Sequence, residues 1–171
     1  GLTLACHLPR EDPRDALVAT TAKTLGDLRP GAVVGTSSVR RKAMLLHARP
    51  DLTIATFRGN VDTRLKKLQR SEADATVLAI AGLKRLGAES HTAHVFSTNE
   101  MLPAVAQGAI GVEVLEANAK LRDVLSAADH RESALAVTLE RAFLATLDGS
   151  CRTPIAGLAE WNNDGALAFT G

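Results

Sequence analysis

The sequence predicts an α/β fold with a largely parallel sheet. Between residues 32 and 86, a short apolar run, a turn and a helical segment follow one another three times, the order of elements in a parallel α/β domain. The 171 residues are 46% hydrophobic and 23% charged, a composition typical of a folded chain rather than a disordered one. This length suffices for one large domain or two small ones.

The segments before this pattern predict a strand, a hinge and a helix. Residues 2–5 alternate weakly between apolar and polar and indicate a short strand. Residues 9–15 are charged and contain two prolines, which favours a connector between domains. Residues 20–28 are expected to form a helix that ends at the Arg29-Pro30-Gly31 turn.

The three units of the pattern are read from apolar runs separated by turn residues. In the first helix, Val39, Ala43 and Leu46 share one apolar face. The predicted ranges are strand 32–34, turn 35–38 and helix 39–48; strand 52–57, turn 58–60 and helix 61–69; and strand 75–80 followed by a short helix 81–86.

The last third of the chain predicts two more helices and a hairpin. A strand is expected at 111–115, a helix at 119–126 and a strand at 166–169. Asp129 and Glu132 have the spacing of a capping box, which would begin the longest helix. This helix would continue through residue 147 and end at Gly149, and a hairpin turn is expected at 162–165.

Composition argues against several classes of protein. The sequence has no apolar run near the ~20 residues of a membrane helix and does not open with the layout of a signal peptide. Cys6 and Cys151 are far apart and form no CxxC motif, which fits a reducing, cytoplasmic compartment, although a single disulfide is also consistent with this spacing. His91 and His94 have no companion ligands, so no metal site is expected.

Positive charge is concentrated in the middle of the sequence. Residues 40–85 contain 11 basic and 4 acidic residues, whereas the rest contains 9 and 15. Such a region indicates an anionic ligand or simply a solvated basic face. A nucleic-acid partner is disfavoured because Phe57 is the only aromatic residue there and the base-stacking side chains are therefore missing.

The sharpest local signal is the segment GTSSVRR at 35–41. A strand that enters a helix through small hydroxyl residues leaves free backbone N–H groups at the helix start, and adjacent arginines can bind a carboxylate or phosphate. The alternative is a well-capped helix with two exposed arginines.

The turn Arg58-Gly59-Asn60 follows the next predicted strand, and Arg64 lies in the helix after it. Ligands of parallel sheets bind at the carboxyl ends of strands, so Arg40, Arg41, Arg58 and Arg64 are expected to converge there. Lys66, Lys67 and Arg70 are expected to face solvent.

Cys151 lies in a predicted loop beside Arg152. A loop thiol near a cation can be a nucleophile or a covalent attachment point, and an unreactive cysteine is the alternative. Cys6 is expected to be a small core residue.

Taken in order, seven segments resemble the hydroxymethylbilane synthase, or porphobilinogen deaminase, family. They are REDPRDA at 10–16, GTSSVRR at 35–41, RPDL at 49–52, RGNVDTRL at 58–65, AGLKRL at 81–86, LPAVAQGA at 102–109 and GSCRTP at 149–154.

The resemblance implies a reaction and a cofactor. Members of this family join four porphobilinogen molecules head to tail, with loss of ammonia, on a dipyrromethane primer. The resemblance places the thioether to this primer on Cys151. It also implies binding positions for the pyrrole carboxylates and the cleft, at Arg10, Thr36, Ser37, Ser38, Arg40, Arg41, Arg58, Gly59, Asn60, Arg64, Arg85 and Gln107.

The same resemblance implies a two-lobed architecture like that of periplasmic binding proteins, with parallel or mixed sheets and a small α+β C-terminal domain. Residues 14–102 would form domain 2, residues 1–13 and 103–126 parts of domain 1, and residues 131–171 an incomplete domain 3. The family's catalytic aspartate would fall upstream of Gly1, so no catalytic residue is expected in this chain, which would be an inactive, cytoplasmic fragment of a monomeric enzyme.

Three other functions are consistent with parts of the pattern. A non-catalytic anion-binding module of the periplasmic-binding-protein type would explain the two arginine-bearing turns equally well, but it would need no pyrrole on Cys151. A nucleic-acid binder lacks stacking aromatics, and a thiol hydrolase lacks an evident base.

Overall fold

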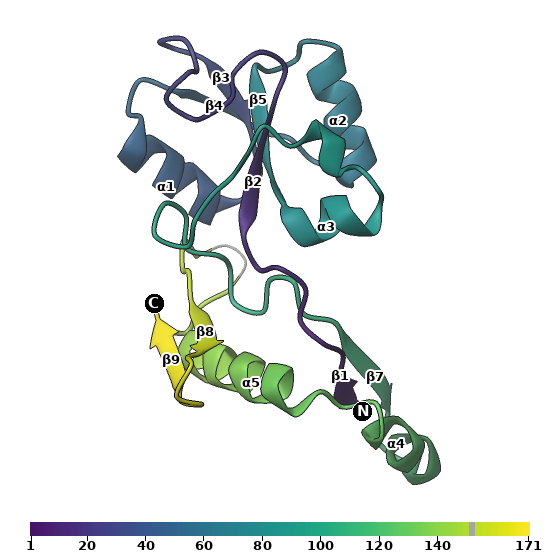
Figure 1. Ribbon diagram of the computed structural model, residues 1–171. Coiled ribbons are helices and arrows are strands. Elements are labelled where there is room, and N and C mark those ends of the chain that lie inside the picture. Colours follow the sequence, from purple (N-terminus) through teal and green to yellow (C-terminus); the bar gives the residue numbers. More distant parts are fainter. Residues whose placement is uncertain (151–152) are drawn as a thin grey trace.

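The computed structural model describes residues 1–150 and 153–171 of the chain. Figure 1 shows an α/β lobe joined by two connecting segments to a smaller part that holds both chain termini. The connecting segments, 8–14 and 96–110, run side by side, with Leu8 N donating to Ile110 O (3.0 Å) and Glu11 N to Gly108 O (3.1 Å).

The α/β lobe is built on a mixed five-stranded sheet in the order β4-β3-β5-β2-β6. β3 is parallel to β4 and β5, whereas β2 is antiparallel to β5 and β6. The predicted parallel strands are therefore present, and two antiparallel strands extend the sheet. Their bounds are β2 Asp15–Ala19, β3 Val33–Gly35, β4 Thr53–Ala55, β5 Ala75–Ala79 and β6 His94–Val95.

Helices cover both faces of this sheet (Figure 1). The predicted helices 39–48 and 61–69 are confirmed as α1 (Val39–Ala48) and α2 (Val61–Gln69), and α3 spans Ile80–Arg85. α1 packs on the core that contains Leu17, Val34 and Leu45. α2 and α3 pack on the opposite face through a second core, whose members include Leu65, Leu68 and Leu83. A 3-10 turn, η1 (Glu89–His91), precedes β6.

The predicted helix 20–28 is wrong, since this segment is a series of turns. Thr24 donates to Asp27 Oδ2 through its backbone N (2.8 Å) and through its hydroxyl (2.9 Å). This local hydrogen bonding offers the backbone an alternative to the helix ladder.

β2 was not anticipated, because residues 16–18 are apolar without alternation. These residues are buried on both faces of the sheet, and a strand of this kind shows no period of two.

Close packing in the lobe depends on Gly35, the last residue of β3. A Cβ atom on Gly35 would lie 2.5 Å from Phe57 Cγ and 2.6 Å from Phe57 Cε2, and Phe57 is buried. The predicted strand 52–57 is accordingly shorter, since Phe57 lies beyond β4 and fills the space above this glycine.

We expect Gly35→Ala to lower the free energy of unfolding by about 1–3 kcal/mol, because the new methyl group overpacks a buried ring. Gly82→Ala in α3 is the matched control. Its Cβ would meet only Val61 Cγ2 at 3.6 Å, so alanine should stabilise the helix by about 0.5–1 kcal/mol. Urea denaturation of the two variants tests this, and equal midpoints would contradict the packing argument.

The smaller part contains a two-stranded ribbon and a helical unit. β1 (Leu2–His7) pairs antiparallel with β7 (Gly111–Leu115), and α4 (Ala119–Ser126) follows. Cys6 is buried, as expected. The C-terminal unit consists of α5 (Arg131–Thr146) and the hairpin of β8 (Leu158–Trp161) with β9 (Leu167–Thr170).

The predicted capping box at the start of α5 is wrong. His130 is the N-cap, and its Nδ1 accepts from Ser133 N. Asp129 Oδ1 instead accepts from His7 N at 2.7 Å, because the neighbouring β1 places a backbone donor there. The predicted end at residue 147 is one residue too late, since α5 ends at Thr146 with Leu147 as its C-cap. Asp148, with a φ of +49°, takes the left-handed position expected for Gly149, and Gly149 N donates to Leu144 O at 2.9 Å.

Within the described ranges, the helices are all too short or too polar to cross a bilayer.

Candidate functional site

A cavity of about 410 Å³ lies between the α/β lobe and the C-terminal unit. We call it the basic cavity, because three arginines line it. Its lining residues are Ser37, Ser38, Val39, Arg40, Arg41, Arg64, Ala104, Val105, Leu144, Ser150, Thr153 and Ile155. These residues come from α1, α2, the second connecting segment and the end of α5 with its following loop, so the cavity exists only where these parts meet.

Hydroxyl groups hold the start of α1 at this cavity. Ser38 is the N-cap and its Oγ accepts from Arg41 N at 3.3 Å. The hydroxyl of buried Thr36 accepts from Ser38 N at 3.2 Å, and Thr36 N donates to Ala55 O at 2.8 Å. Ser37 is exposed. The turn therefore both caps the helix and presents hydroxyls to the cavity.

Arg40 and Arg41 are buried, with exposed fractions of 4% and 9%, so the alternative of two exposed arginines is wrong. Both bind Asp15, which is fully buried at the start of β2. Arg40 Nη2 lies 2.7 Å from Asp15 Oδ2, and Arg41 Nη2 lies 2.7 Å from Asp15 Oδ1. These two ion pairs offset part of the cost of burying three charges.

Gln107 connects this cluster to both connecting segments. Its Nε2 donates to Asp15 Oδ1 (2.9 Å) and to Pro13 O (2.6 Å), and Arg40 Nη1 donates to Leu102 O (2.7 Å). Gln107 thus lies beside the basic cavity rather than in its lining.

Asp15 was missing from the predicted site. The sequence feature that could have indicated it is an acidic residue directly before the apolar run 16–19. A carboxylate that is buried together with such a run requires a cationic partner.

The electrostatics of the cavity suit an anionic group. Burial lowers the pKa of the Arg40 guanidinium, and Asp15 opposes this effect. Burial, followed by the charge of Arg41, also lowers the pKa of Arg64. Arginine nonetheless keeps its charge in proteins. Arg40 Nε is a buried donor without a hydrogen-bond partner in the described part of the chain, and such an unsatisfied donor favours an incoming oxygen.

The second turn and the helix that follows it contribute one arginine of two to the basic cavity. Asn60 caps α2 by accepting from Thr63 N at 2.9 Å, and Gly59 has a φ of +113°. Arg64 reaches back to Gly59 O (3.0 Å) and to Ser37 Oγ (3.4 Å), which places it at the basic cavity. Arg58 is exposed and does not line it.

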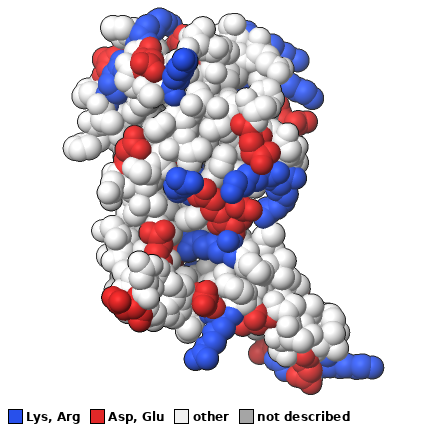
Figure 2. Space-filling view, viewed as in Figure 1, with Lys and Arg blue, Asp and Glu red and all other residues white. Residues whose placement is uncertain are grey.

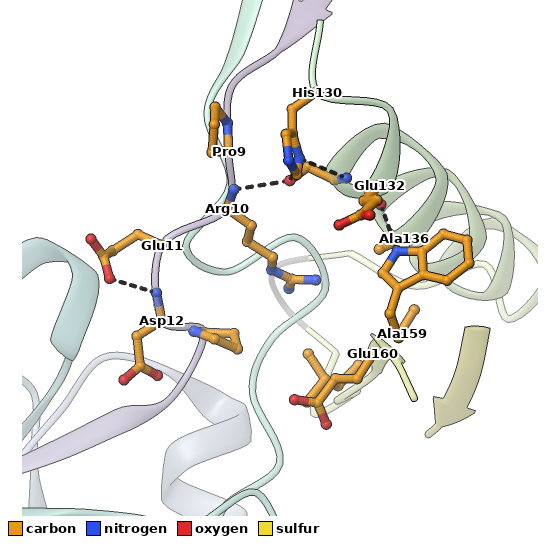
Figure 3. A pocket seen from close by; sticks show the side chains of 13 residues that line it. Pro9, Arg10, Glu11, Asp12, His130, Glu132, Ala136, Ala159 and Glu160 are labelled. Carbon is orange, nitrogen blue, oxygen red and sulfur yellow. Dashed lines mark hydrogen bonds between the residues drawn. The ribbon is translucent and has the colours of Figure 1, made fainter. Parts of the chain in front are cut away.

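Arg10 and Arg85 lie away from the basic cavity. Arg85 is exposed at the end of α3. Arg10 lines a separate cavity of about 340 Å³, shown in Figure 3, where it extends from the first connecting segment towards α5. Its guanidinium pairs with Glu140 Oε1 at 2.5 Å, and its Nε donates to Gln107 O at 3.0 Å.

Charged side chains of both signs gather at the waist of the molecule on the face in Figure 2. The first connecting segment contributes two ion pairs, Arg14 with Asp12 (2.7 Å) and Glu11 with Lys84 (2.8 Å). Three basic residues of the positive region, Lys84, Arg40 and Arg41, are thus paired with acidic residues from outside it, Glu11 and Asp15, which the fold brings to them.

The predicted attachment residue Cys151, with Arg152, lies outside the described residues. Its neighbours Ser150 and Thr153 both line the basic cavity. Within the described ranges no group of three or more His, Cys, Asp or Glu side chains is arranged to hold a metal ion.

The mixed sheet with helices on both faces, and a cavity where the lobe meets the C-terminal unit, define an α/β protein with a ligand-sized cavity beside its sheet. A lipoprotein of Bacillus subtilis shares this fold, with a TM-score of 0.51 and 17% identity over 77% of this chain and 63% of that chain. Residues 1–123 match the dipyrromethane cofactor-binding domain of porphobilinogen deaminase, and residues 134–171 match its C-terminal domain. The chain therefore belongs to the porphobilinogen deaminase family.

Two relatives named porphobilinogen deaminase illustrate the match. The chloroplastic protein of Pisum sativum is 52% identical over 169 residues, which cover 98% of this chain and 46% of the relative. The protein of Paracoccus denitrificans is 56% identical over 164 residues, or 96% of this chain and 52% of the relative. The chain thus spans about half the length of the curated relatives it matches.

Proposed function

We propose that this chain is part of a hydroxymethylbilane synthase, which joins four porphobilinogen molecules head to tail with loss of ammonia. The observation that carries the proposal is the basic cavity, with three arginines at the junction of the two matched family domains. Each pyrrole of the substrate bears an acetate and a propionate, so a growing chain of pyrroles is a polyanion that several arginines can bind.

The residues present fit the dipyrromethane cofactor. The guanidinium groups of Arg40, Arg41 and Arg64 and the hydroxyls of Ser37 and Ser38 would hold its carboxylates, and the unsatisfied Arg40 Nε supports this. When bound, the cofactor supplies the ring from which the chain of pyrroles grows. Ionic contacts from rigid side chains would orient the rings. Thr36 would act by holding the helix start.

The remaining predicted positions have supporting or peripheral roles in this proposal. Gly59 and Asn60 shape the turn that places Arg64. Arg58 and Arg85 would meet later rings of the growing chain, because both are exposed on the α/β lobe. Arg10 and Gln107 would hold the connecting segments in register.

Cys151 is proposed as the thioether attachment point, supported by its position between two residues that line the basic cavity. The complete enzyme is proposed to be monomeric and cytoplasmic. Because the chain spans about half of its relatives, we propose that it does not turn over porphobilinogen by itself, and that the catalytic aspartate belongs to the other half.

The intact mass of the isolated chain, followed by a peptide map, tests this proposal. We expect an excess equal to two linked pyrrole units on the peptide that contains Cys151, and no excess in Cys151→Ser with the fold retained. A stable covalent pyrrole in Cys151→Ser would refute the attachment site. An unmodified thiol in the unchanged chain would instead favour a non-catalytic anion-binding module, which the fold of the Bacillus subtilis lipoprotein also fits.

A further inference from the structure

The carboxylate of Asp15 has all its hydrogen-bonding capacity directed at the cavity arginines and at Gln107. Its Oδ1 accepts from Arg41 Nε (3.1 Å) and Nη2 (2.7 Å), and also from Gln107 Nε2 (2.9 Å). Its Oδ2 accepts from Arg40 Nη2 (2.7 Å). Four hydrogen bonds therefore hold this fully buried carboxylate in one orientation.

These contacts orient both guanidinium planes. Arg41 is held through two nitrogens of one edge by Asp15 and through Nη1 by Val77 O at 3.1 Å. Arg40 is held through Nη2 by Asp15 and through Nη1 by Leu102 O at 2.7 Å. Both side chains therefore lose their rotameric freedom during folding rather than during ligand binding, which increases affinity by preorganisation.

We propose that Asp15 is a positioning residue, which aims Arg40 and Arg41 at the pyrrole carboxylates without contacting them. The proposal rests on the proposed function for the identity of the ligand. Asp15 belongs to β2 and does not line the basic cavity, so it acts through the arginines. Gln107 holds Asp15 in turn, and its bond to Pro13 O links this arrangement to the first connecting segment.

Because Asp15 is charged, the direction in which its removal changes the affinity for an anion tests the proposal. Removing the negative charge that pairs with Arg40 and Arg41 makes the cavity more positive, which by Coulomb attraction alone would tighten the binding of an anion. If Asp15 positions the arginines, its removal frees their side chains and weakens binding in spite of the added positive charge. After the removal of Asp15, Coulomb attraction alone therefore predicts tighter anion binding, whereas the positioning role predicts weaker binding.

Isothermal titration with porphobilinogen, carried out in the Cys151→Ser background so that no covalent pyrrole occupies the basic cavity, measures this sign. We expect Asp15→Asn to weaken binding about 10-fold, the cost of ordering two long side chains at the moment of binding. Asp12→Asn is the matched control, because it removes the same charge from the first connecting segment, where Asp12 pairs with Arg14. The affinity of Asp12→Asn for porphobilinogen should stay within about twofold of the value measured without this substitution. Unchanged or tighter binding by Asp15→Asn would overturn the proposal.

A second variant tests the proposal if Asp15→Asn does not fold, and a measurement without ligand tests it if porphobilinogen does not bind. Should Asp15→Asn fail to fold, Gln107→Leu removes the bond to Asp15 without a change of charge, and it should weaken binding severalfold; unchanged affinity would overturn the proposal.

NMR of the arginine Nε–H groups needs no ligand. We expect the Arg41 signal to be sharp in the unchanged chain and broadened in the variants, and an unchanged signal would refute the positioning role. If the Cys151→Ser chain, whose basic cavity holds no covalent pyrrole, bound no porphobilinogen, the proposed function would fail, while this NMR comparison would still decide how Asp15 acts.

Discussion

Glu140→Gln is expected to lower the free energy of unfolding of this chain by about 3–5 kcal/mol, the cost of breaking a buried ion pair by removing one partner. Glu140 lies in α5 with an exposed fraction of 0%, and the Arg10 side chain opposite is 11% exposed. Solvent therefore screens the pair very little, and the glutamine would leave a buried guanidinium without its counter-charge.

The same carboxylate also accepts from two backbone donors, one half-buried and one buried. Ala106 N donates to Glu140 Oε2 at 2.6 Å, and Ala159 N donates to Oε1 at 2.8 Å. One side chain thus joins α5 to both connecting segments and to β8. In Glu140→Gln, the amide NH₂ would face a donor on one side, so a hydrogen bond is lost in addition to the charge.

Glu132→Gln is the matched control, since Glu132 is an exposed residue of the same helix. Its backbone carbonyl, not its carboxylate, accepts from Trp161 Nε1 at 3.1 Å (Figure 3). A change of at most about 0.5 kcal/mol is expected for such a surface site. Urea denaturation followed by circular dichroism measures both variants, and similar midpoints would mean that Glu140 does not join these segments.

Arg64→Leu is expected to weaken porphobilinogen binding by about 10- to 100-fold, because a hydrogen bond to a charged group contributes about 1.5–3 kcal/mol. Arg64 lines the basic cavity and, within the described ranges, forms no ion pair with a carboxylate. Its loss therefore removes a cation for the ligand without leaving a buried acid unpaired, and the stability of the chain should change little.

Lys66→Leu removes the same charge two residues further along α2. Lys66 is exposed and lies 4.0 Å from Asp62, away from the basic cavity. We expect its affinity for porphobilinogen to change by less than about twofold. Isothermal titration measures both variants in the Cys151→Ser background, in which no covalent pyrrole fills the basic cavity. Equal losses in the two variants would show that the ligand responds to the general charge of α2 and that the cavity is not its site.

Elements with strong local signals were predicted well from the sequence. The helices at 39–48 and 61–69 have the predicted bounds, because an N-capping side chain, Ser38 or Asn60, begins each of them and its hydrogen bond closes within three residues. The hairpin around residues 162–165 likewise depends on contacts between near neighbours, such as Asn162 Oδ1 with Ala166 N.

Elements whose stability comes from distant partners were missed. β2 is buried between β5 and β6, and residues 16–18 show no alternation because both faces are covered. Asp129 has the spacing of a capping box, but His7 N competes for its carboxylate from 122 residues away. A local rule fails where a tertiary contact provides a better partner.

The sequence by itself determined the α/β class, the helix starts of the two arginine-bearing turns and, through seven matching segments, the family. Only the tertiary structure decided which arginines share a site. Arg40 and Arg41 meet Asp15 across 25 and 26 residues, and Arg10 meets Glu140 across 130. Caps and periodicity arise from neighbouring residues and can be read locally. A buried charge must be compensated by whichever opposite charge the fold brings to it. The pairings of Asp15 are therefore settled only when β2 and α1 pack in the α/β lobe, and that of Glu140 only when α5 packs on the connecting segments.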